Sequence, residues 1–204
     1  MIKNIIFDLG NVVLKLKWNI VLDKYLQNNE DKRLMEDVIF NSEEWQKLDE
    51  GTIEKTVAIE RMLSKLPKEL HTACIEIMKN WQDALVINNQ TIDFIKELNS
   101  KGYNTYVLSN APLDIPTYLT ENGLDKYFKG KIISAEEKIV KPNKAIYELI
   151  LNRFSLTPEE CLFLDDKPEN IASAADCNIN GYVFDYNSFD TFLKDMRENY
   201  SINI

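Results

Sequence analysis

Short, almost purely apolar runs alternate along the chain with longer segments whose apolar residues recur every three or four positions. Such runs are typical of strands buried on both faces, and such segments of helices with one buried face. Strands are expected at residues 2–8, 103–108, 131–134, 161–164 and 181–184. Helices are expected between them, at residues 91–100, 143–154 and 171–177. This alternation predicts an α/β fold, in which a Rossmann-like parallel sheet is covered by helices on both faces.

The region from residue 17 to 84 departs from this alternation. It contains no strand-like run, and its apolar residues follow helical spacing throughout. Helices are expected at residues 18–26, 32–40, 53–66 and 69–81. We therefore expect a helical cap domain at residues 17–84, inserted into an α/β core domain formed by residues 1–16 and 85–204.

The composition is that of a soluble folded enzyme-sized protein, with 204 residues of which 45% are hydrophobic. Acidic residues outnumber basic ones by 33 to 24, which gives a formal net charge of −9. Nucleic acids and anionic membranes are bound mainly through positive patches, so neither is an expected partner. The N-terminal apolar run ends at Phe7, too early for a signal sequence or a membrane span. We expect a cytoplasmic protein, and the sequence leaves monomer and homodimer open.

Cysteine and histidine chemistry find little support in this sequence. Cys74, Cys161 and Cys177 are widely spaced and have no second metal ligand nearby, so they are expected to be reduced thiols in the core. The single histidine, His71, lies in a polar helical stretch and is not expected to be catalytic.

Polar residues suited to chemistry follow the ends of several expected strands. They are Asp8, Ser109, Asn110, Lys141, Asp165 and Asp166. Because the carboxyl ends of parallel strands meet at one edge of a sheet, these side chains are expected to gather there. Gathered carboxylates can hold a divalent cation, and a hydroxyl with loop N–H groups suits phosphate oxygens. Singly, each residue also has an ordinary structural explanation, such as a turn-capping role for Asp8.

Together and in this order, the motifs resemble those of the haloacid dehalogenase superfamily of phosphatases. The matching segments are Phe-Asp-Leu-Gly-Asn-Val at residues 7–12, Leu-Ser-Asn at 108–110, Lys-Pro at 141–142 and Phe-Leu-Asp-Asp at 163–166, with Asn170 following. The resemblance extends from Ile5 to about Tyr186, and the helical insertion looks like the small cap of that superfamily. It is closest to the subgroup that includes α-D-glucose-1-phosphate phosphatase and the N-terminal phosphatase domain of soluble epoxide hydrolases. In the sheet order of the family, the first strand is central, between the second and the fourth.

The resemblance implies a Mg²⁺-dependent phosphatase that acts on a small phosphorylated metabolite, similar to a sugar phosphate. Asp8 would be the nucleophile and would form an aspartyl phosphate that water then hydrolyses. Mg²⁺ would be held by Asp8, the main-chain carbonyl of Gly10 and Asp166. Asp165 would also lie at the metal site.

The resemblance also implies the phosphate contacts. Lys141 would hold both Asp8 and the transferring phosphoryl group, while Ser109, Asn110 and nearby loop amides would bind its oxygens. Asn170 would orient Asp166 or Lys141, and its structural alternative is a cap at the start of a helix.

Gly10 departs from the usual pattern, because most phosphatases of this superfamily carry a second aspartate there. That aspartate protonates the leaving oxygen and then activates water, which glycine cannot do. General acid–base catalysis contributes about 10²–10⁴-fold, so its loss is a substantial handicap. Three explanations stay open: substrates with good leaving groups, a substitute such as water or a cap carboxylate like Asp49, or lost catalysis.

Two other functions compete with the phosphatase. A catalytically weak member of the fold, kept as a ligand- or partner-binding protein, is compatible with Gly10. A haloacid dehalogenase needs neither a metal nor an acid at position 10, but the adjacent carboxylates of Asp165 and Asp166 would then repel Asp8 without a cation.

Substrate specificity is expected to reside in the cap. Residues 43–51 combine an aromatic side chain, Trp45, with polar neighbours and end at a glycine, as a pocket wall would. Packing of Trp45 between cap helices is the structural alternative.

Overall fold

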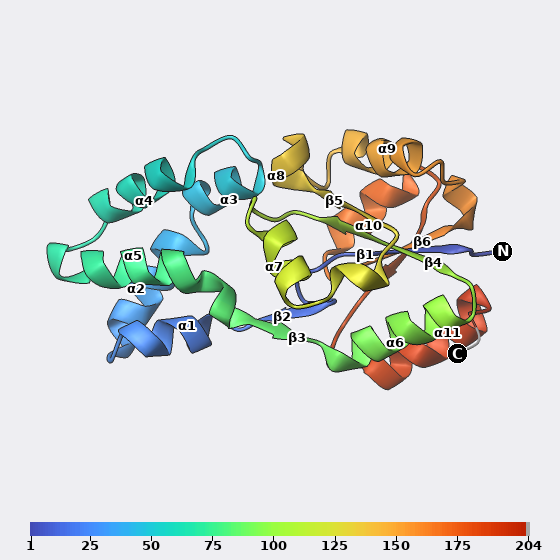
Figure 1. Cartoon of the computed structure of the whole chain (residues 1–204), viewed down its shortest axis with the longest axis horizontal. Helices are drawn as coiled ribbons and strands as arrows, with labels where there is room; N and C mark the ends of the chain where they lie inside the picture. The colour runs from blue at the N-terminus through green and yellow to red at the C-terminus, as the bar shows by residue number, and fades with distance from the viewer. Residues whose placement is uncertain (203–204) are drawn as a thin grey trace.

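The five strands expected from the apolar runs form one parallel sheet in the order β5-β4-β1-β6-β7 (Figure 1). The computed structural model describes residues 1–202. The strands are β1 (Asn4–Phe7), β4 (Asn104–Ser109), β5 (Gly130–Ile133), β6 (Cys161–Asp165) and β7 (Asn180–Val183). The central place of β1, between β4 and β6, is the order that the family resemblance implies. The ends of β1, β4 and β6 therefore lie side by side.

Helices cover both faces of this sheet, as predicted. They include α6 (Asn89–Ser100) and α11 (Phe189–Tyr200) on one face and α9 (Lys144–Arg153) and α10 (Pro168–Ala175) on the other. Phe7 of β1 meets Phe94 of α6 edge-on, and Phe94 meets Phe192 of α11 in the same way. On the opposite face, Tyr147 of α9 packs edge-on against Phe163 of β6. Successive strand residues point to opposite faces, which explains why the central strands β1 and β6 are largely apolar.

A short antiparallel pair, β2 (Leu14–Leu16) and β3 (Leu85–Ile87), carries the chain away from the sheet and back. Leu16 pairs with Leu85. These are the positions at which the sequence predicts that the chain leaves the core and returns to it. The pairing itself was not predicted, because three-residue strands carry too little periodicity to be recognised.

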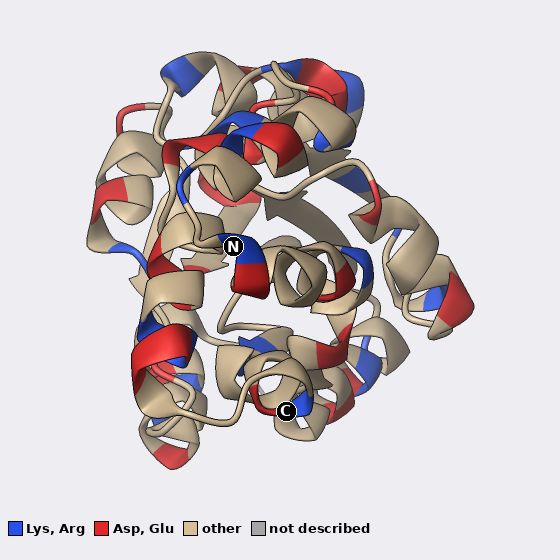
Figure 2. Cartoon of the chain, turned by 90° about the vertical axis from the view of Figure 1, so that its left-hand side faces the viewer, with Lys and Arg blue, Asp and Glu red and all other residues tan. Residues whose placement is uncertain are grey.

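The chain between β2 and β3 is helical and lies at one end of the molecule, which we call the helical block (residues 18–84; Figure 1). Its α-helices are α1 (Trp18–Tyr25), α2 (Asn29–Ile39), α3 (Glu43–Asp49), α4 (Lys55–Ser64) and α5 (His71–Asn80), with 3₁₀ turns at Lys68–Leu70 and Trp81–Ala84. Acidic and basic residues are interspersed over the outer surface of this block (Figure 2). The division into core and cap domains stays a prediction.

Helix α3 was not predicted as a helix. Ser42 begins it, since its side chain accepts a hydrogen bond from the main-chain N–H of Trp45. Glu43 and Glu44 then place negative charge in the first turn, where the helix dipole favours it. Seven residues are too few for the hydrophobic pattern alone to reveal a helix.

The remaining helical segments are short and connect the strands β4, β5 and β6. They are α7 (Ile115–Glu121), α8 (Ser134–Glu137) and the 3₁₀ turns at Asp125–Tyr127 and Pro158–Glu160. The three cysteines are buried and free, as expected. Among residues 1–202, no helix is long and apolar enough to cross a membrane.

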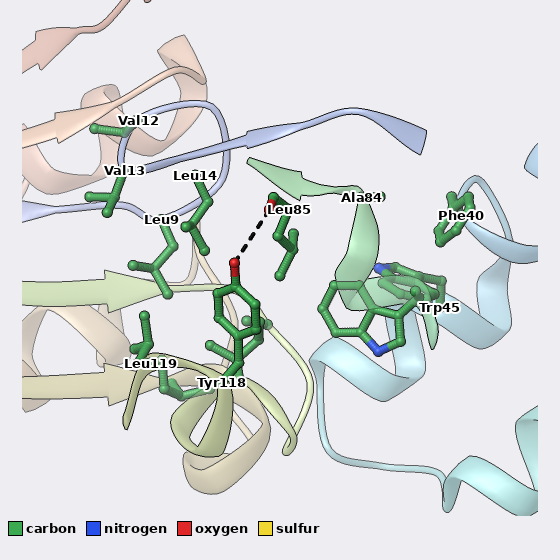
Figure 3. Packing of buried hydrophobic residues seen from close by; sticks show 14 of the residues in the cluster. Leu9, Val12, Val13, Leu14, Phe40, Trp45, Ala84, Leu85, Tyr118 and Leu119 are labelled. Carbon is green, nitrogen blue, oxygen red and sulfur yellow. Dashed lines mark hydrogen bonds between the residues drawn. The ribbon is translucent and has the colours of Figure 1, made fainter. Parts of the chain in front are cut away.

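One hydrophobic cluster runs from the sheet into the helical block. Figure 3 shows Leu9 and Leu14 beside Tyr118 and Leu119 of α7, with Phe40 and Trp45 further along in the helical block. The hydroxyl of Tyr118 donates a hydrogen bond to the main-chain oxygen of Leu85 at 3.3 Å. Shared packing of this kind positions the helical block over the strand ends.

Candidate active site

A cavity of about 690 Å³ lies between the strand ends and the helical block. Residues that follow the strands line one side of it, namely Asp8, Gly10, Asn11, Ser109, Asn110, Lys141, Asp166, Lys167 and Asn170. Residues of the helical block line the other side, including Trp18, Phe40, Trp45, Asp49, Glu50 and Trp81. The structure thus brings the candidate residues together from segments far apart in the sequence.

Asp8 lies at the end of the central strand and is buried. Its Oδ1 atom is 2.9 Å from Lys141 Nζ, and the Ser109 side chain nearby acts to lower the pKa of Asp8. Burial raises the pKa of Asp8 to about 6, although the positive charge of Lys141 acts in the opposite direction. A carboxylate held at the cavity floor beside a cation is suited to nucleophilic attack on an anionic group.

Lys141 is buried together with two carboxylates. Its Nζ atom donates hydrogen bonds to Asp165 Oδ2 at 2.6 Å and to the main-chain oxygen of Leu108 at 3.1 Å. Burial acts to lower the pKa of Lys141, but the charges of Asp8 and Asp165 outweigh it and hold the pKa above its ordinary value. The side chain therefore stays a cation next to Asp8.

Asn110 fixes the loop that carries Lys141. Its side-chain nitrogen donates to the main-chain oxygen of Lys141 at 2.9 Å, and its Oδ1 accepts from the Lys141 N–H at 2.8 Å. These bonds use Oδ1 and one of the two Nδ2 hydrogens, and the phosphate contact of Asn110 stays a prediction.

Asp165 is fully buried and already supplied with donors. Its Oδ1 accepts from the N–H of Lys167 at 2.8 Å and from Asn170 Nδ2 at 2.9 Å, while its Oδ2 accepts from Lys141. Asn170 therefore binds Asp165, which in turn binds Lys141, whereas a role of Asn170 toward Asp166 stays a prediction. The helix-cap alternative for Asn170 is wrong, because α10 begins without a side-chain cap. Asn170 acts on Lys141 only through Asp165.

Three carboxylates could share a metal ion. Asp8, Asp165 and Asp166 each place one oxygen within 4.8 Å of the others. Carboxylate oxygens are preferred ligands of Mg²⁺, and one ammonium group among three acids leaves negative charge for a cation to balance. Since hydrogen bonds already occupy both oxygens of Asp165, Asp8 and Asp166 are the better ligand candidates.

Asn11 is a site residue that sequence reasoning missed. It has a left-handed backbone with φ 54°, a conformation that asparagine tolerates better than most residues. Its Nδ2 donates to Asp166 Oδ2 at 2.9 Å. Burial raises the pKa of Asp166, and the bond from Asn11 opposes that shift. An asparagine directly after a glycine in a tight turn was the available signal.

Trp45 combines the two roles that the sequence leaves open. It packs edge-on against Phe40 and Trp81, with ring centroids 5.0 and 5.1 Å away, and Trp18 stacks on Phe40 at 3.9 Å. All four rings also line the cavity, and Figure 3 shows Phe40 and Trp45 among them. Packing between helices therefore holds Trp45 in place as a cavity wall.

Asp49 brings a carboxyl group to the cavity from the end of α3. Its Oδ1 atom is buried and has no hydrogen-bond partner within residues 1–202. Burial raises the pKa of Asp49 to about 7, the charge of Lys167 acts to lower it, and that of Asp8 to raise it. Gly10 has no carboxyl group to act as an acid, but Asp49 brings one to the same cavity from the helical block.

Comparisons with known proteins match this geometry. A family model described as haloacid dehalogenase-like hydrolase matches residues 2–178. A sesquiterpene phosphatase of Aspergillus oryzae is 28% identical over 177 residues, which cover 84% of this chain and 84% of that protein. A D-ribitol-5-phosphate phosphatase of Bacteroides thetaiotaomicron is 25% identical over 182 residues, which cover 84% of this chain and 86% of that protein.

A solved structure shares the fold over nearly the whole chain. It is the magnesium complex of a HAD family enzyme from Bacteroides thetaiotaomicron, with a TM-score of 0.74 at 21% identity. The match covers 95% of this chain and 98% of that one.

Proposed function

Because the chain belongs to the haloacid dehalogenase-like hydrolase family, we propose that it is a magnesium-dependent phosphatase. Its substrate is a small, sugar-phosphate-like monoester, and its intermediate is an aspartyl phosphate on Asp8. The observation that carries this proposal is the ion pair between Asp8 and Lys141 at 2.9 Å on the cavity floor. It places a carboxylate nucleophile and a phosphate-attracting cation at one point.

Asp8, Asp166 and the main-chain carbonyl of Gly10 would hold the metal. The buried carboxylate cluster fits Mg²⁺, because its donors are oxygens and its net charge is negative. Bound Mg²⁺ neutralises charge on the phosphoryl oxygens and so reduces their repulsion of the carboxylate. Asn11 orients Asp166 for this task through their hydrogen bond.

The residues around Asp8 divide the work of phosphoryl transfer. Asp8 attacks phosphorus in line with the leaving oxygen, and Lys141 stabilises the negative charge on the transferring group. Ser109 lines the same cavity as Asp8, where phosphoryl oxygens would lie. Asp165 and Asn170 hold Lys141 in position from below.

The cavity supports a small substrate with both polar and apolar surface. Its volume of about 690 Å³ is in the usual range for small-molecule sites. Aromatic rings at one wall can stack on the apolar face of a sugar or on a hydrocarbon, while Asn41, Gln46 and Glu50 can bind hydroxyl groups. Two relatives are named as phosphatases, one for a polyol phosphate and one for a sesquiterpene.

The acids count against the dehalogenase alternative. Asp166 is half-buried near Asp8, and its partner is the neutral side chain of Asn11. A metal-free dehalogenase would gain nothing from a second carboxylate that repels its nucleophile. The binding-protein alternative does not account for the buried cation beside Asp8, which desolvation makes costly.

A substrate screen tests the proposal directly. Phosphate release would be measured with Mg²⁺ and after EDTA treatment on sugar phosphates, polyol phosphates, isoprenoid phosphates and p-nitrophenyl phosphate, with 2-chloropropionate as the dehalogenase arm. We expect Mg²⁺-dependent release of phosphate from several esters and none by the Asp8→Asn variant. Chloride release, or phosphate release that survives Asp8→Asn, would refute the proposal.

A further inference from the structure

The proposed phosphatase has no proton donor at position 10. The leaving alkoxide of a sugar or polyol phosphate is strongly basic, so its departure needs a proton. A substitute acid must reach the side of the cavity where the organic group lies, opposite Asp8. Residues of the helical block form that side.

Asp49 is a carboxyl group in that position. It is the last residue of α3, it lines the cavity together with Asp8, and its Oδ1 is buried without a hydrogen-bond partner. A buried carboxyl oxygen that stabilises nothing in the fold is costly to maintain. A structural role leaves that cost unexplained, whereas a role toward a bound group explains it.

The main chain around Asp49 is anchored to the sheet. The Ser134 hydroxyl, at the end of β5, donates a hydrogen bond to the main-chain oxygen of Asp49 and accepts one from the N–H of Ala111. Gly51, two residues later, has φ +65° and lies against Ala135. Asp49 is therefore held relative to the loop after β4, which begins directly after Ser109.

We propose that Asp49 is the general acid and base of this enzyme, replacing the aspartate absent at position 10. The proposal rests on the phosphatase function proposed above. It follows from the geometry of a carboxyl that lines the same cavity as Asp8 and whose buried Oδ1 has no partner in the described residues.

Burial favours the protonated form of Asp49 that the first step requires. Asp8, Asp114 and Glu50 act to raise the pKa of Asp49, and Lys167 acts to lower it. Burial, the largest effect, raises it to about 7. An acid with a pKa near neutrality can give up a proton and take one back in successive steps.

Two steps convert the phosphate ester into an alcohol and inorganic phosphate. In the first, Asp8 forms a bond to phosphorus, the bond from phosphorus to the ester oxygen breaks, and Asp49 transfers its proton to that oxygen, releasing an alcohol. In the second, the Asp49 carboxylate takes a proton from water as the water oxygen attacks phosphorus. The bond from Asp8 to phosphorus breaks, its electron pair returns to the Asp8 carboxylate, and inorganic phosphate leaves.

A leaving-group series separates this role from a structural one. kcat/KM would be measured for aryl and alkyl phosphates over a wide range of leaving-group pKa, with Mg²⁺, for the wild type and for Asp49→Asn. We expect a shallow dependence in the wild type and a steep one in Asp49→Asn. The variant should lose about 10²–10⁴-fold on alkyl phosphates and far less on p-nitrophenyl phosphate.

Pre-steady-state kinetics give a second readout. With p-nitrophenyl phosphate, formation of the aspartyl phosphate needs no acid, but its hydrolysis still needs the base. Asp49→Asn should therefore release a burst of p-nitrophenolate close to one equivalent, followed by slow turnover. Glu43→Gln is the matched control, since Glu43 is an exposed acid of the same helix that is not among the cavity-lining residues.

The outcomes of these experiments separate a failure of the role of Asp49 from a failure of the phosphatase proposal. An unchanged leaving-group dependence, or an equal loss on every ester, overturns the role of Asp49. If Asp49→Asn does not fold, Asp49→Ser replaces it with the same expectations. A wild type that hydrolyses no ester in the series would instead indicate failure of the phosphatase proposal itself.

Discussion

Gly51 approaches Ala135 so closely that a Cβ atom at position 51 would lie 2.1 Å from the Ala135 main-chain oxygen. This contact joins the end of α3 to the edge of the sheet and positions Asp49. Gly51→Ala should therefore lower the free energy of unfolding by about 1–2 kcal/mol for the left-handed backbone, plus about 1–3 kcal/mol for the clash. Urea titration measures the loss.

Gly123→Ala is the control for Gly51→Ala. Gly123 has the same φ of +65°, but its nearest neighbour is the end of the flexible Lys126 side chain at 3.9 Å. Only the backbone cost should appear in this control. Equal losses in the two variants would show that the approach to Ala135 is not required for stability.

The ionisation of Asp49 should make stability depend on pH. Its pKa rises from the ordinary 3.8 to about 7 on folding, so its favourable contribution is lost as pH increases through that interval. Asp49→Asn stays neutral and should be more stable than the wild type at pH 8, by about 1–3 kcal/mol, with the difference vanishing near pH 4. Thermal melts of the EDTA-treated proteins across this range provide the measurement. A difference that grows toward low pH would contradict the raised pKa.

Lys141 should be essential for stability as well as for turnover. Lys141→Met leaves Asp8 and Asp165 buried without their cation, and such uncompensated charges destabilise by about 3–5 kcal/mol. We expect a lower melting temperature and no detectable phosphatase activity. Lys144→Met removes an exposed lysine nearby, which pairs with Glu148, and should change neither property. A stable, active Lys141→Met variant would refute the assigned role.

Position 10 has room for the missing acid. A Cβ atom there would meet Leu16 Cδ1 at 3.5 Å and Asp8 Oδ2 at 3.9 Å, both ordinary contacts. Gly10→Asp introduced into Asp49→Asn should therefore restore at least about 10-fold of the activity lost on alkyl phosphates. Steady-state kinetics with one alkyl phosphate tests the rescue. A folded double variant with no gain would show that a carboxyl at position 10 does not reach the leaving oxygen in this chain.

The sheet could be predicted from the sequence because its central strands β1, β4 and β6 are buried on both faces. Runs such as Cys161–Leu164 carry a strong signal, and the acids at their ends indicated where the site lies. The pair β2 and β3 and the helix α3 escaped prediction, since each is too short for its period to be visible. Their positions depend on contacts with distant segments, such as Leu16 with Leu85.

The residues of the site could be predicted from the sequence, but their hydrogen bonds could not. Which residues follow which strands can be read from the chain, and these residues line one cavity, except Asp165, which is buried beneath it. The partners of Asn110 and Asn170 could not be predicted, because amide side chains bind whichever donors and acceptors the folded loops place nearby. The sequence could name Asp49 only as an example of a cap carboxylate, whereas the fold places it in the same cavity as Asp8.

The account stands on covalent chemistry at Asp8, which rapid-quench mass spectrometry can observe. Wild-type protein with Mg²⁺ would be mixed with an active phosphate ester, quenched in acid within one turnover and mapped by peptides. We predict that the peptide containing Asp8 carries one phosphoryl group and that the modification disappears in Asp8→Asn. Turnover of the ester without any phosphoryl group on Asp8, within the time resolution of the quench, would contradict the account.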